Sequence, residues 1–204
     1  LVLAPLSDIA SDKTLSEKSR RCIEIAQSNG NKLHGLITEL LDFQKADTMG
    51  EGLVKTEIMV NTMLTTQVEK FQHLANEKKI SMEITDCDLN AKVLMDVNLS
   101  GKLFDNLLSN AIKYTGENGN IDVRASLVEG NDNSVYLQLE VKDTGIGIVP
   151  EELDNIFKKY YQTRRGYNAS HKGWGIGLAT VKKLVEIHKG NISVTSKVGE
   201  GTSF

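Results

Sequence analysis

Residues 98–114 read NLSGKLFDNLLSNAIKY, and this stretch decides the fold class and the position of the site. It contains no proline and predicts one long helix. Four apolar residues recur at four-residue steps along one face: Leu99, Leu103, Leu107 and Ala111. Asn106, Asn110 and Lys113 form an adjacent polar stripe. Amide oxygens are suitable ligands for Mg²⁺, and an ammonium group attracts phosphate. The stripe therefore indicates either a metal–phosphate site or an ordinary solvated helix face.

Shorter periodic segments surround this helix and indicate an α+β domain. We expect strands at 53–58, 80–85, 92–95, 121–128, 135–141, 191–196 and 202–204. We expect further helices at 61–78 and 176–188. Neighbouring strands joined by short turns, with helices between the others, predict a mixed sheet with helices on one face, an α+β sandwich.

The N-terminal segment has a different, coiled-coil-like pattern. Residues 1–10 read as the end of a helix bent by Pro5, and residues 11–13 as a short connection. Thr14 and Glu17 match a capping box before a helix over 15–47. A seam with alternating steps of four and three runs along that helix: Cys22, Ala26, Asn29, Leu33, Leu36, Leu40 and Phe43.

Two helices joined by a short turn predict an antiparallel hairpin. Its apolar stripe is buried either in a four-helix bundle with a second copy or against the chain's own C-terminal domain. The sequence thus predicts a helical hairpin at 1–48, a hinge at 49–52, where two glycines break the helix, and an α+β domain at 53–204.

Composition describes an ordinary globular chain of 204 residues, with 40% hydrophobic and 25% charged residues. Its net charge of -3 and its dispersed basic residues give no reason to expect a nucleic acid partner. Cys22 and Cys87 lack neighbouring Cys or His, which argues against a zinc site or a disulfide framework. No apolar run approaches the roughly 20 residues that span a bilayer. Because the chain begins without Met and stops inside a strand-like run, we expect a longer parent protein.

A second motif, DTGIGI at 143–148, directly follows the strand expected at 135–141. Its glycines allow a tight turn and a close approach of the backbone to a flat ligand. The Asp143 carboxylate can accept a hydrogen bond from an exocyclic amine such as that of adenine. By itself the motif is weak, because an ordinary Asp-x-Gly turn has the same pattern.

A third motif, GWGIGL at 173–178, opens the helix expected at 176–188. Free N–H groups at a helix N-terminus bind anions. No strand immediately precedes the glycines, so a dinucleotide-binding βαβ unit is not indicated. The polar segment 160–172 is typical of a mobile lid, and its Arg164, Arg165 and Lys172 could close over phosphates. A plain solvated loop is the alternative.

Taken in order, the motifs resemble those of the catalytic and ATP-binding domain of sensor histidine kinases. They are NLLSNAIKY at 106–114, DTGIG at 143–147, IFKKYYQ at 156–162, GWGIGL at 173–178 and GEGTSF at 199–204. The hairpin resembles the dimerisation and histidine phosphotransfer region of that family, so the resemblance covers essentially the whole chain. It implies a Bergerat-type fold, a mixed sheet layered with helices. It also implies transfer of the γ-phosphate of Mg-ATP to a histidine, for relay to a response-regulator aspartate.

The resemblance assigns roles by position. Asn106 and Lys113 would act in catalysis, Asn110 would bind Mg²⁺, Asp143 would fix adenine and Phe157 would anchor the lid. The whole expected nucleotide site comprises Asn106, Asn110, Lys113, Tyr114, Asp143, Gly145, Gly147, Ile148, Phe157, Arg164, Arg165, Lys172, Gly173, Gly175, Gly177 and Leu178.

Two positions depart from the family pattern. The phosphoacceptor of the family is a His followed by Glu, a basic residue, Thr and Pro. This chain has four histidines, and none of them is followed by that sequence: His34, His73, His171 and His188. We therefore expect the acceptor upstream of Leu1 and no autophosphorylation by this segment alone. Trp174 stands where small residues are more usual.

The resemblance also implies partners: a second copy bound through the hairpin, and the receiver domain of a response regulator. It implies a cytoplasmic location for this segment and allows a parent protein anchored in the inner membrane. The alternatives are an ATPase or serine-directed kinase of the same fold, or a non-catalytic nucleotide-sensing module. Water-hydrolysing relatives typically carry Glu at position 106, and an Asn amide cannot act as a base, so we expect very slow ATP hydrolysis.

Overall fold

The computed structural model describes residues 3–10, 15–48, 52–87, 91–130, 134–163 and 174–204. The chain divides into two compact units, 1–45 and 46–204, and each is described by itself. The first unit contains α1 (Leu3–Ala10) and most of α2 (Glu17–Thr48). These two helices lie where the sequence predicts helices.

The beginning of α2 differs from the prediction. Glu17 is the first helical residue, and the Ser16 hydroxyl accepts the backbone N–H of Ser19 at 3.1 Å. Ser16 therefore caps the helix, which begins two residues later than the predicted start at residue 15. Thr14, the first residue of the predicted capping box, lies outside the described residues. Several large apolar side chains of α2 are exposed: Ile25, Leu33, Ile37, Leu40 and Leu41.

The second unit contains the sheet and its covering helices. In chain order its elements are β1 (Thr56–Met59), α3 (Val60–Glu77), β2 (Ser81–Cys87), β3 (Lys92–Met95), α4 (Val97–Tyr114), β4 (Asn120–Glu129), β5 (Val135–Asp143), α5 (Pro150–Leu153), α7 (Gly177–Ile187), β6 (Thr195–Lys197) and β7 (Gly201–Ser203). The predicted helices and strands of this unit all appear, with shifted ends. The short helix α5 was not predicted, because four residues show no helical period.

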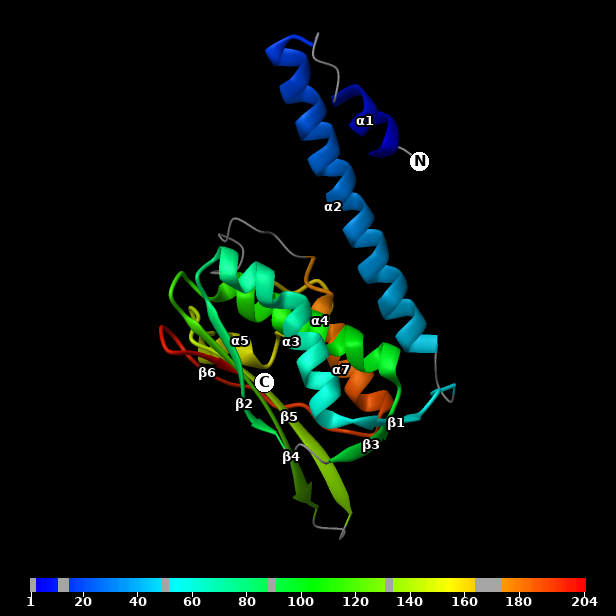
Figure 1. Cartoon of the computed structure of the whole chain (residues 1–204), viewed down its shortest axis with the longest axis vertical. Helices are drawn as coiled ribbons and strands as arrows, with labels where there is room; N and C mark the ends of the chain where they lie inside the picture. The colour runs from blue at the N-terminus through cyan, green and yellow to red at the C-terminus, as the bar shows by residue number, and fades with distance from the viewer. Residues whose placement is uncertain (1–2, 11–14, 49–51, 88–90, 131–133, 164–173) are drawn as a thin grey trace. The chain divides into compact units, whose positions relative to one another are not determined.

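Five strands form one sheet in the order β2-β4-β5-β7-β6. β2 runs parallel to β4, and the remaining pairs are antiparallel. β1 and β3 form a separate antiparallel pair. The helices α3, α4 and α7 cover one face of the larger sheet (Figure 1). The expected mixed sheet in an α+β sandwich is confirmed.

The strand expected at 191–196 is shorter than predicted. Only Thr195–Lys197 pairs with a neighbour, because β7 itself spans three residues. Ile192 nevertheless packs against the core. A side chain can thus be buried where its backbone is not paired in the sheet.

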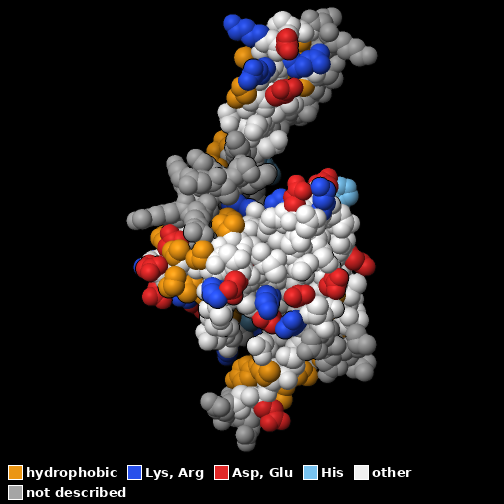
Figure 2. All heavy atoms as spheres, turned by 90° about the vertical axis from the view of Figure 1, so that its left-hand side faces the viewer, with side chains coloured by type: hydrophobic (Ala, Val, Ile, Leu, Met, Phe, Trp, Pro, Cys, Tyr) orange, Lys and Arg blue, Asp and Glu red, His pale blue; other side chains and the backbone are white. Residues whose placement is uncertain are grey.

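The hairpin of β4 and β5 reaches beyond its neighbours (Figure 1). β2 pairs with β4 only as far as Ala125, and four large apolar side chains lie exposed beyond that point: Leu127, Val128, Val135 and Tyr136. Elsewhere on the face shown in Figure 2, acidic and basic side chains are interspersed.

α4 lies at the centre of the core. Its buried side recurs at helical spacing: Leu99, Leu103, Phe104, Leu107, Leu108, Ala111 and Ile112. Asp96 caps its N-terminus, because its Oδ1 accepts the N–H groups of Asn98 and Leu99 at 3.0 and 3.1 Å. At the other end, the Lys78 ammonium donates to the Ile112 carbonyl at 2.8 Å, which suits the negative end of the helix dipole.

Replacing Phe104 with Ala tests the central position of α4. Phe104 has no exposed surface. The variant should lose about 3–5 kcal/mol of unfolding free energy, because the cavity cannot fully collapse. Chemical denaturation followed by circular dichroism measures the loss. Leu94→Ala is the control, because Leu94 is 68% exposed and should change stability by less than about 0.5 kcal/mol. A small loss for Phe104→Ala would contradict the core assignment.

Candidate functional site

The amide stripe of α4 faces the start of α7. Asn106 Nδ2 donates to the Lys102 carbonyl at 2.8 Å, which leaves its Oδ1 as the outward acceptor. A Cβ on Gly177 would lie 2.6 Å from that oxygen, so a larger residue at position 177 would displace the Asn106 side chain from its present position. Asn110 is half-buried, and no described residue hydrogen bonds to its side chain.

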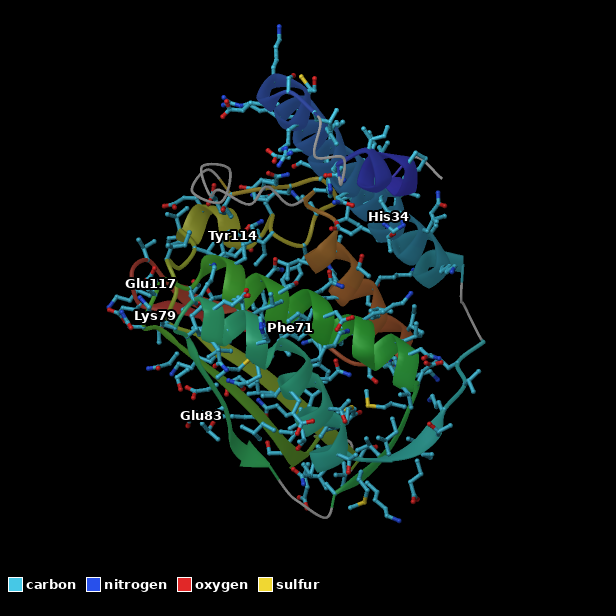
Figure 3. All side chains as sticks on the ribbon, turned by 45° about the horizontal axis from the view of Figure 1, so that its top comes forward. His34, Phe71, Lys79, Glu83, Tyr114 and Glu117 are labelled. Carbon is cyan, nitrogen blue, oxygen red and sulfur yellow. The ribbon has the colours of Figure 1, made fainter. Side chains whose placement is uncertain are left out.

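The end of the stripe is formed by Lys113 and Tyr114. The Lys113 ammonium lies 4.7 Å from the centre of the Tyr114 ring, within the range of a cation–π interaction. Figure 3 shows Tyr114 at the C-terminal end of α4, on the same side of the domain as the ion pair of Lys79 and Glu117. The ring therefore holds the ammonium near the end of the helix.

Asp143 is a buried acid at the end of β5, with 6% of its surface exposed. Its Oδ1 accepts the backbone N–H of Gly145 at 2.8 Å, and the backbone N–H of Thr202 also donates to the carboxylate. Burial raises the pKa of this carboxyl above its ordinary value of 3.8, and the two hydrogen bonds offset part of the rise. A buried acceptor held in this way suits recognition of an amine on a flat ring.

The loop after Asp143 is fixed to three other parts of the domain. The Ile146 N–H donates to the Tyr114 carbonyl at 3.2 Å, and the Ile148 N–H donates to the Ser196 hydroxyl at 2.9 Å. The Thr144 hydroxyl accepts the backbone N–H of Asn120 at 2.9 Å. These bonds join the loop to α4, β6 and β4.

Two glycines of this loop have no room for a side chain. A Cβ on Gly145 would lie 2.5 Å from the Tyr114 carbonyl oxygen, and one on Gly147 would meet the Lys197 carbonyl. Gly147 also has a φ of 66°, a left-handed conformation that favours glycine. The glycines of the motif are therefore required by packing within the protein, whatever the ligand.

The first residue of the expected lid is bonded to the glycine segment that follows the lid. The Tyr160 N–H donates to the Gly175 carbonyl at 2.7 Å. Gly175 has a φ of 71°, and a Cβ there would lie 2.6 Å from the Tyr161 carbonyl. Trp174 is 38% exposed beside this contact.

Phe157 packs edge-to-face on Phe204, with ring centres 6.2 Å apart. This contact joins the segment before the expected lid to the end of the chain. Leu178 is partly buried and packs against the core.

The structure thus brings the expected residues into two groups. One contains Asn106 and Gly177, and the other contains Tyr114, Asp143 and Gly145. α4 connects them, and the eight-residue step between Asn106 and Tyr114 spans about 12 Å at 1.5 Å per residue. Arg164, Arg165, Lys172 and Gly173, and with them most of the expected lid, lie outside the described residues.

Sequence reasoning assigned no role to two residues that support Asp143 and its loop. Thr202 donates its N–H to Asp143, and the Ser196 hydroxyl bonds both the Ile148 N–H and the Thr202 hydroxyl, the latter at 2.8 Å. Thr202 lies in the motif at 199–204, so its position carried a signal. Ser196 carried none, because it lies in none of the motifs and its loop partner Ile148 is 48 residues away in sequence.

Among the described residues, no group of three or more His, Cys, Asp or Glu could hold a metal ion. A Mg²⁺ ion at Asn110 would therefore take its other ligands from water and phosphate, which is common for this ion in nucleotide sites. The half-buried Asn110 amide, with no hydrogen bond from the described residues, fits such a role.

Comparison with known proteins identifies the class. Residues 95–204 match the family model described as histidine kinase-, DNA gyrase B-, and HSP90-like ATPase. The chain belongs to this family. Within it, the chain carries the ATP-binding catalytic domain of the sensor histidine kinases, so the resemblance of the motifs is confirmed.

The relatives are much longer than this chain. Sensor protein EvgS of Escherichia coli O157:H7 is 31% identical over 199 residues, which are 97% of this chain and 16% of that protein. The circadian input-output histidine kinase CikA of Synechococcus elongatus is 31% identical over 193 residues, which are 93% of this chain and 25% of that protein.

A solved structure shows the same fold. The crystal structure of full-length ShkA in complex with AMPPNP has a TM-score of 0.80 and 24% sequence identity, and the match covers all of this chain and 42% of that one. Among the described helices of our chain, none is long and apolar enough to cross a membrane.

The buried carboxyl of Asp143 predicts a pH dependence of stability. Its pKa in the folded state is raised above 3.8, so the folded chain holds this proton more tightly than the unfolded chain. Stability should therefore fall as pH rises from the ordinary pKa through the raised one, and the loss should be complete above it. Unfolding free energies of the wild type and Asp143→Asn, measured from about pH 3 to about pH 7, isolate this contribution. The wild-type value should fall relative to the variant as pH rises, and a flat or rising difference would contradict the prediction.

Proposed function

We propose that this domain binds Mg-ATP in the site along α4 and donates its γ-phosphoryl group to a histidine of the same kinase. The observation that carries the proposal is the buried carboxylate of Asp143 at one end of α4, with the amide stripe of Asn106 and Asn110 along the helix. The carboxylate can accept an amine, and its loop is bonded to the Tyr114 end of α4. Asn106 lies about 12 Å along the helix from Tyr114, with Asn110 between them. These amides suit a metal–phosphate group, so the helix and the loop present groups for both ends of an adenine nucleotide.

Each residue would act through its own chemistry. Asp143 would accept the adenine amino group, and Lys113 would place its charge near phosphate. Asn110 would hold Mg²⁺, which when bound neutralises phosphate charge. The free N–H groups at the start of α7, beside Asn106, would bind phosphate oxygens.

The transfer itself requires little chemistry from the protein. The lone pair of a neutral imidazole nitrogen attacks the γ-phosphorus, the bond to the bridging oxygen breaks, and ADP leaves with that oxygen. Catalysis then rests on positioning and charge neutralisation. Asn106 supports a histidine acceptor over water, because its amide donates to the Lys102 carbonyl and has no basic group to activate water.

We further propose that the parent enzyme works as a homodimer and passes its phosphoryl group to the receiver domain of a response regulator. The support for the dimer is the row of exposed apolar side chains on α2: Ile25, Leu33, Ile37, Leu40 and Leu41. A helix that exposes this much apolar surface needs a partner, and a second copy supplies a four-helix bundle.

Replacing Asn110 with Ala tests the metal end of the site. Calorimetric titration with Mg-ATP should show affinity at least about tenfold lower, because hydrogen bonds and contacts to charged groups carry roughly 1.5–3 kcal/mol. The dependence of affinity on magnesium should weaken as well. Asn76→Ala is the matched control, since Asn76 is exposed on α3 and its side chain accepts a hydrogen bond from Gln72, in the same helix. Equal affinity in both variants would remove Asn110 from the site.

The reaction is tested by mixing the chain with a separate segment of the parent kinase that carries the acceptor histidine. Radiolabel from the γ-phosphate of ATP should appear on that histidine in an acid-labile form, while release of free phosphate stays very slow. Asn106 has no basic group, so hydrolysis should not compete with transfer. Rapid phosphate release without labelled histidine would favour an ATPase, and tight ATP binding without either product would favour a nucleotide-sensing module.

A further inference from the structure

His188, just after the end of α7, contacts both α7 and α4. Its Nδ1 lies 2.8 Å from the Leu184 carbonyl, and the Asp96 backbone N–H donates to its Nε2 at 3.4 Å. Because Nε2 faces a donor, it is the acceptor, and Nδ1 carries the hydrogen given to Leu184. The Asp96 N–H precedes the first turn of α4 and has no partner within that helix. The Leu184 carbonyl, in the last turn of α7, also accepts the backbone N–H of His188 at 3.2 Å.

Asp96 is the centre of this junction. It is 7% exposed, and its Oδ1 caps α4 through two N–H groups. Its Oδ2 accepts the backbone N–H of Val54 at 3.1 Å. The segment around Val54, the start of α4 and the end of α7 are therefore joined at one place.

The opposite contact between these helices lies in the proposed phosphate region. α4 and α7 pack with the end of one beside the start of the other, since His188 meets Asp96 and Gly177 meets Asn106. The ten-residue step from Asp96 to Asn106 spans about 15 Å along α4. The eleven-residue step from Gly177 to His188 spans about 16 Å along α7. The two contacts are therefore about equally far apart on α4 and on α7, and they lie at the two ends of the segment along which these helices pack.

At the Gly177 end, the backbone of α7 lies close to the tip of the Asn106 side chain. A single added carbon at Gly177 would lie 2.6 Å from Asn106 Oδ1. A shift of α7 along or across α4 therefore changes the distance between Asn106 and the N–H groups at the start of α7. Val181 and Leu184 are buried on α7 between these points, in the core cluster that also contains the apolar residues of α4. Such packing permits small sliding movements, because apolar contacts are not directional.

We propose that His188 is a positioning residue for the nucleotide site, which it serves through α7 without contact with the nucleotide. Its two hydrogen bonds fix the end of α7 to Asp96, and this sets the position of Gly177 and the adjacent N–H groups against Asn106. The inference rests on the proposed function, because it assumes that phosphate binds at the start of α7.

The test compares His188→Leu with His188→Gln in the whole chain. Leucine fills the volume but makes neither hydrogen bond, whereas the glutamine amide has an NH2 group that donates and an oxygen that accepts, and can restore both. Calorimetry with a non-hydrolysable ATP analogue and Mg²⁺ should show about a three- to tenfold loss of affinity for leucine, from one or two hydrogen bonds. The glutamine variant should remain within about twofold of the wild type.

Two controls separate positioning from general loss of stability. His73→Leu removes an exposed histidine of α3 and should leave affinity unchanged. Val68→Ala removes buried atoms of α3, and should lower stability without lowering affinity at a temperature where the variant is folded. If His188→Leu does not fold, His188→Asn replaces it, since its shorter amide cannot reach both partners.

Normal affinity in a folded His188→Leu variant would overturn the inference, as would equal losses in the leucine and glutamine variants. An affinity loss of the same size in Val68→Ala would also overturn it, because stability alone would then explain the effect. Absence of binding by the wild type would instead refute the proposed function.

Discussion

The packing of α4 is the constraint on which the rest of this domain depends. One side of the helix is buried among the sheet and the neighbouring helices, with Phe104 and Leu108 completely covered. Its ends are fixed by the Asp96 cap and by the Lys78 ammonium. A helix held on one face and at both ends has no freedom to rotate, so the direction of its polar stripe is set by the core. The proposed site thus takes its geometry from apolar packing.

The proposed site also requires a polar group, the Asp143 carboxylate, in a place from which water is largely excluded. Asp143 is buried, and burial opposes its charge, as the raised pKa shows. Backbone N–H groups of Gly145 and Thr202 stabilise the carboxylate in part, and the loop around it is bonded to α4, β4 and β6. A fixed acceptor of this kind needs no reorganisation when a ligand arrives. Its cost in stability is typical of functional sites, where activity competes with stability.

Much of the fold was predictable because its elements have strong periods. The helix at 98–114 and the strand at 92–95 appear within one residue of their predicted bounds. The errors lie where local patterns have more than one solution. The predicted helix begins at residue 15, whereas α2 begins at Glu17 with Ser16 as its cap, because several Ser and Thr residues lie near that start and only the backbone path decides which one caps it. The observed strand β6 is shorter than the strand predicted at 191–196, because its length depends on its partner β7, which the local sequence does not reveal.

By itself, the sequence determined the class of the protein, the order of its motifs and the residue types of the site. Asn106, Asn110 and Lys113 share a face because the helical period places them there, and this needs no tertiary information. Only the tertiary structure showed why certain positions are occupied by glycine and which distant residues form hydrogen bonds with one another. Gly177 lies against Asn106, and Gly145 lies against the Tyr114 carbonyl. His188 connects Leu184 with Asp96, although His188 and Asp96 are 92 residues apart in the sequence. Such contacts depend on how helices and strands pack, and side-chain periodicity within one segment contains no record of its distant neighbours.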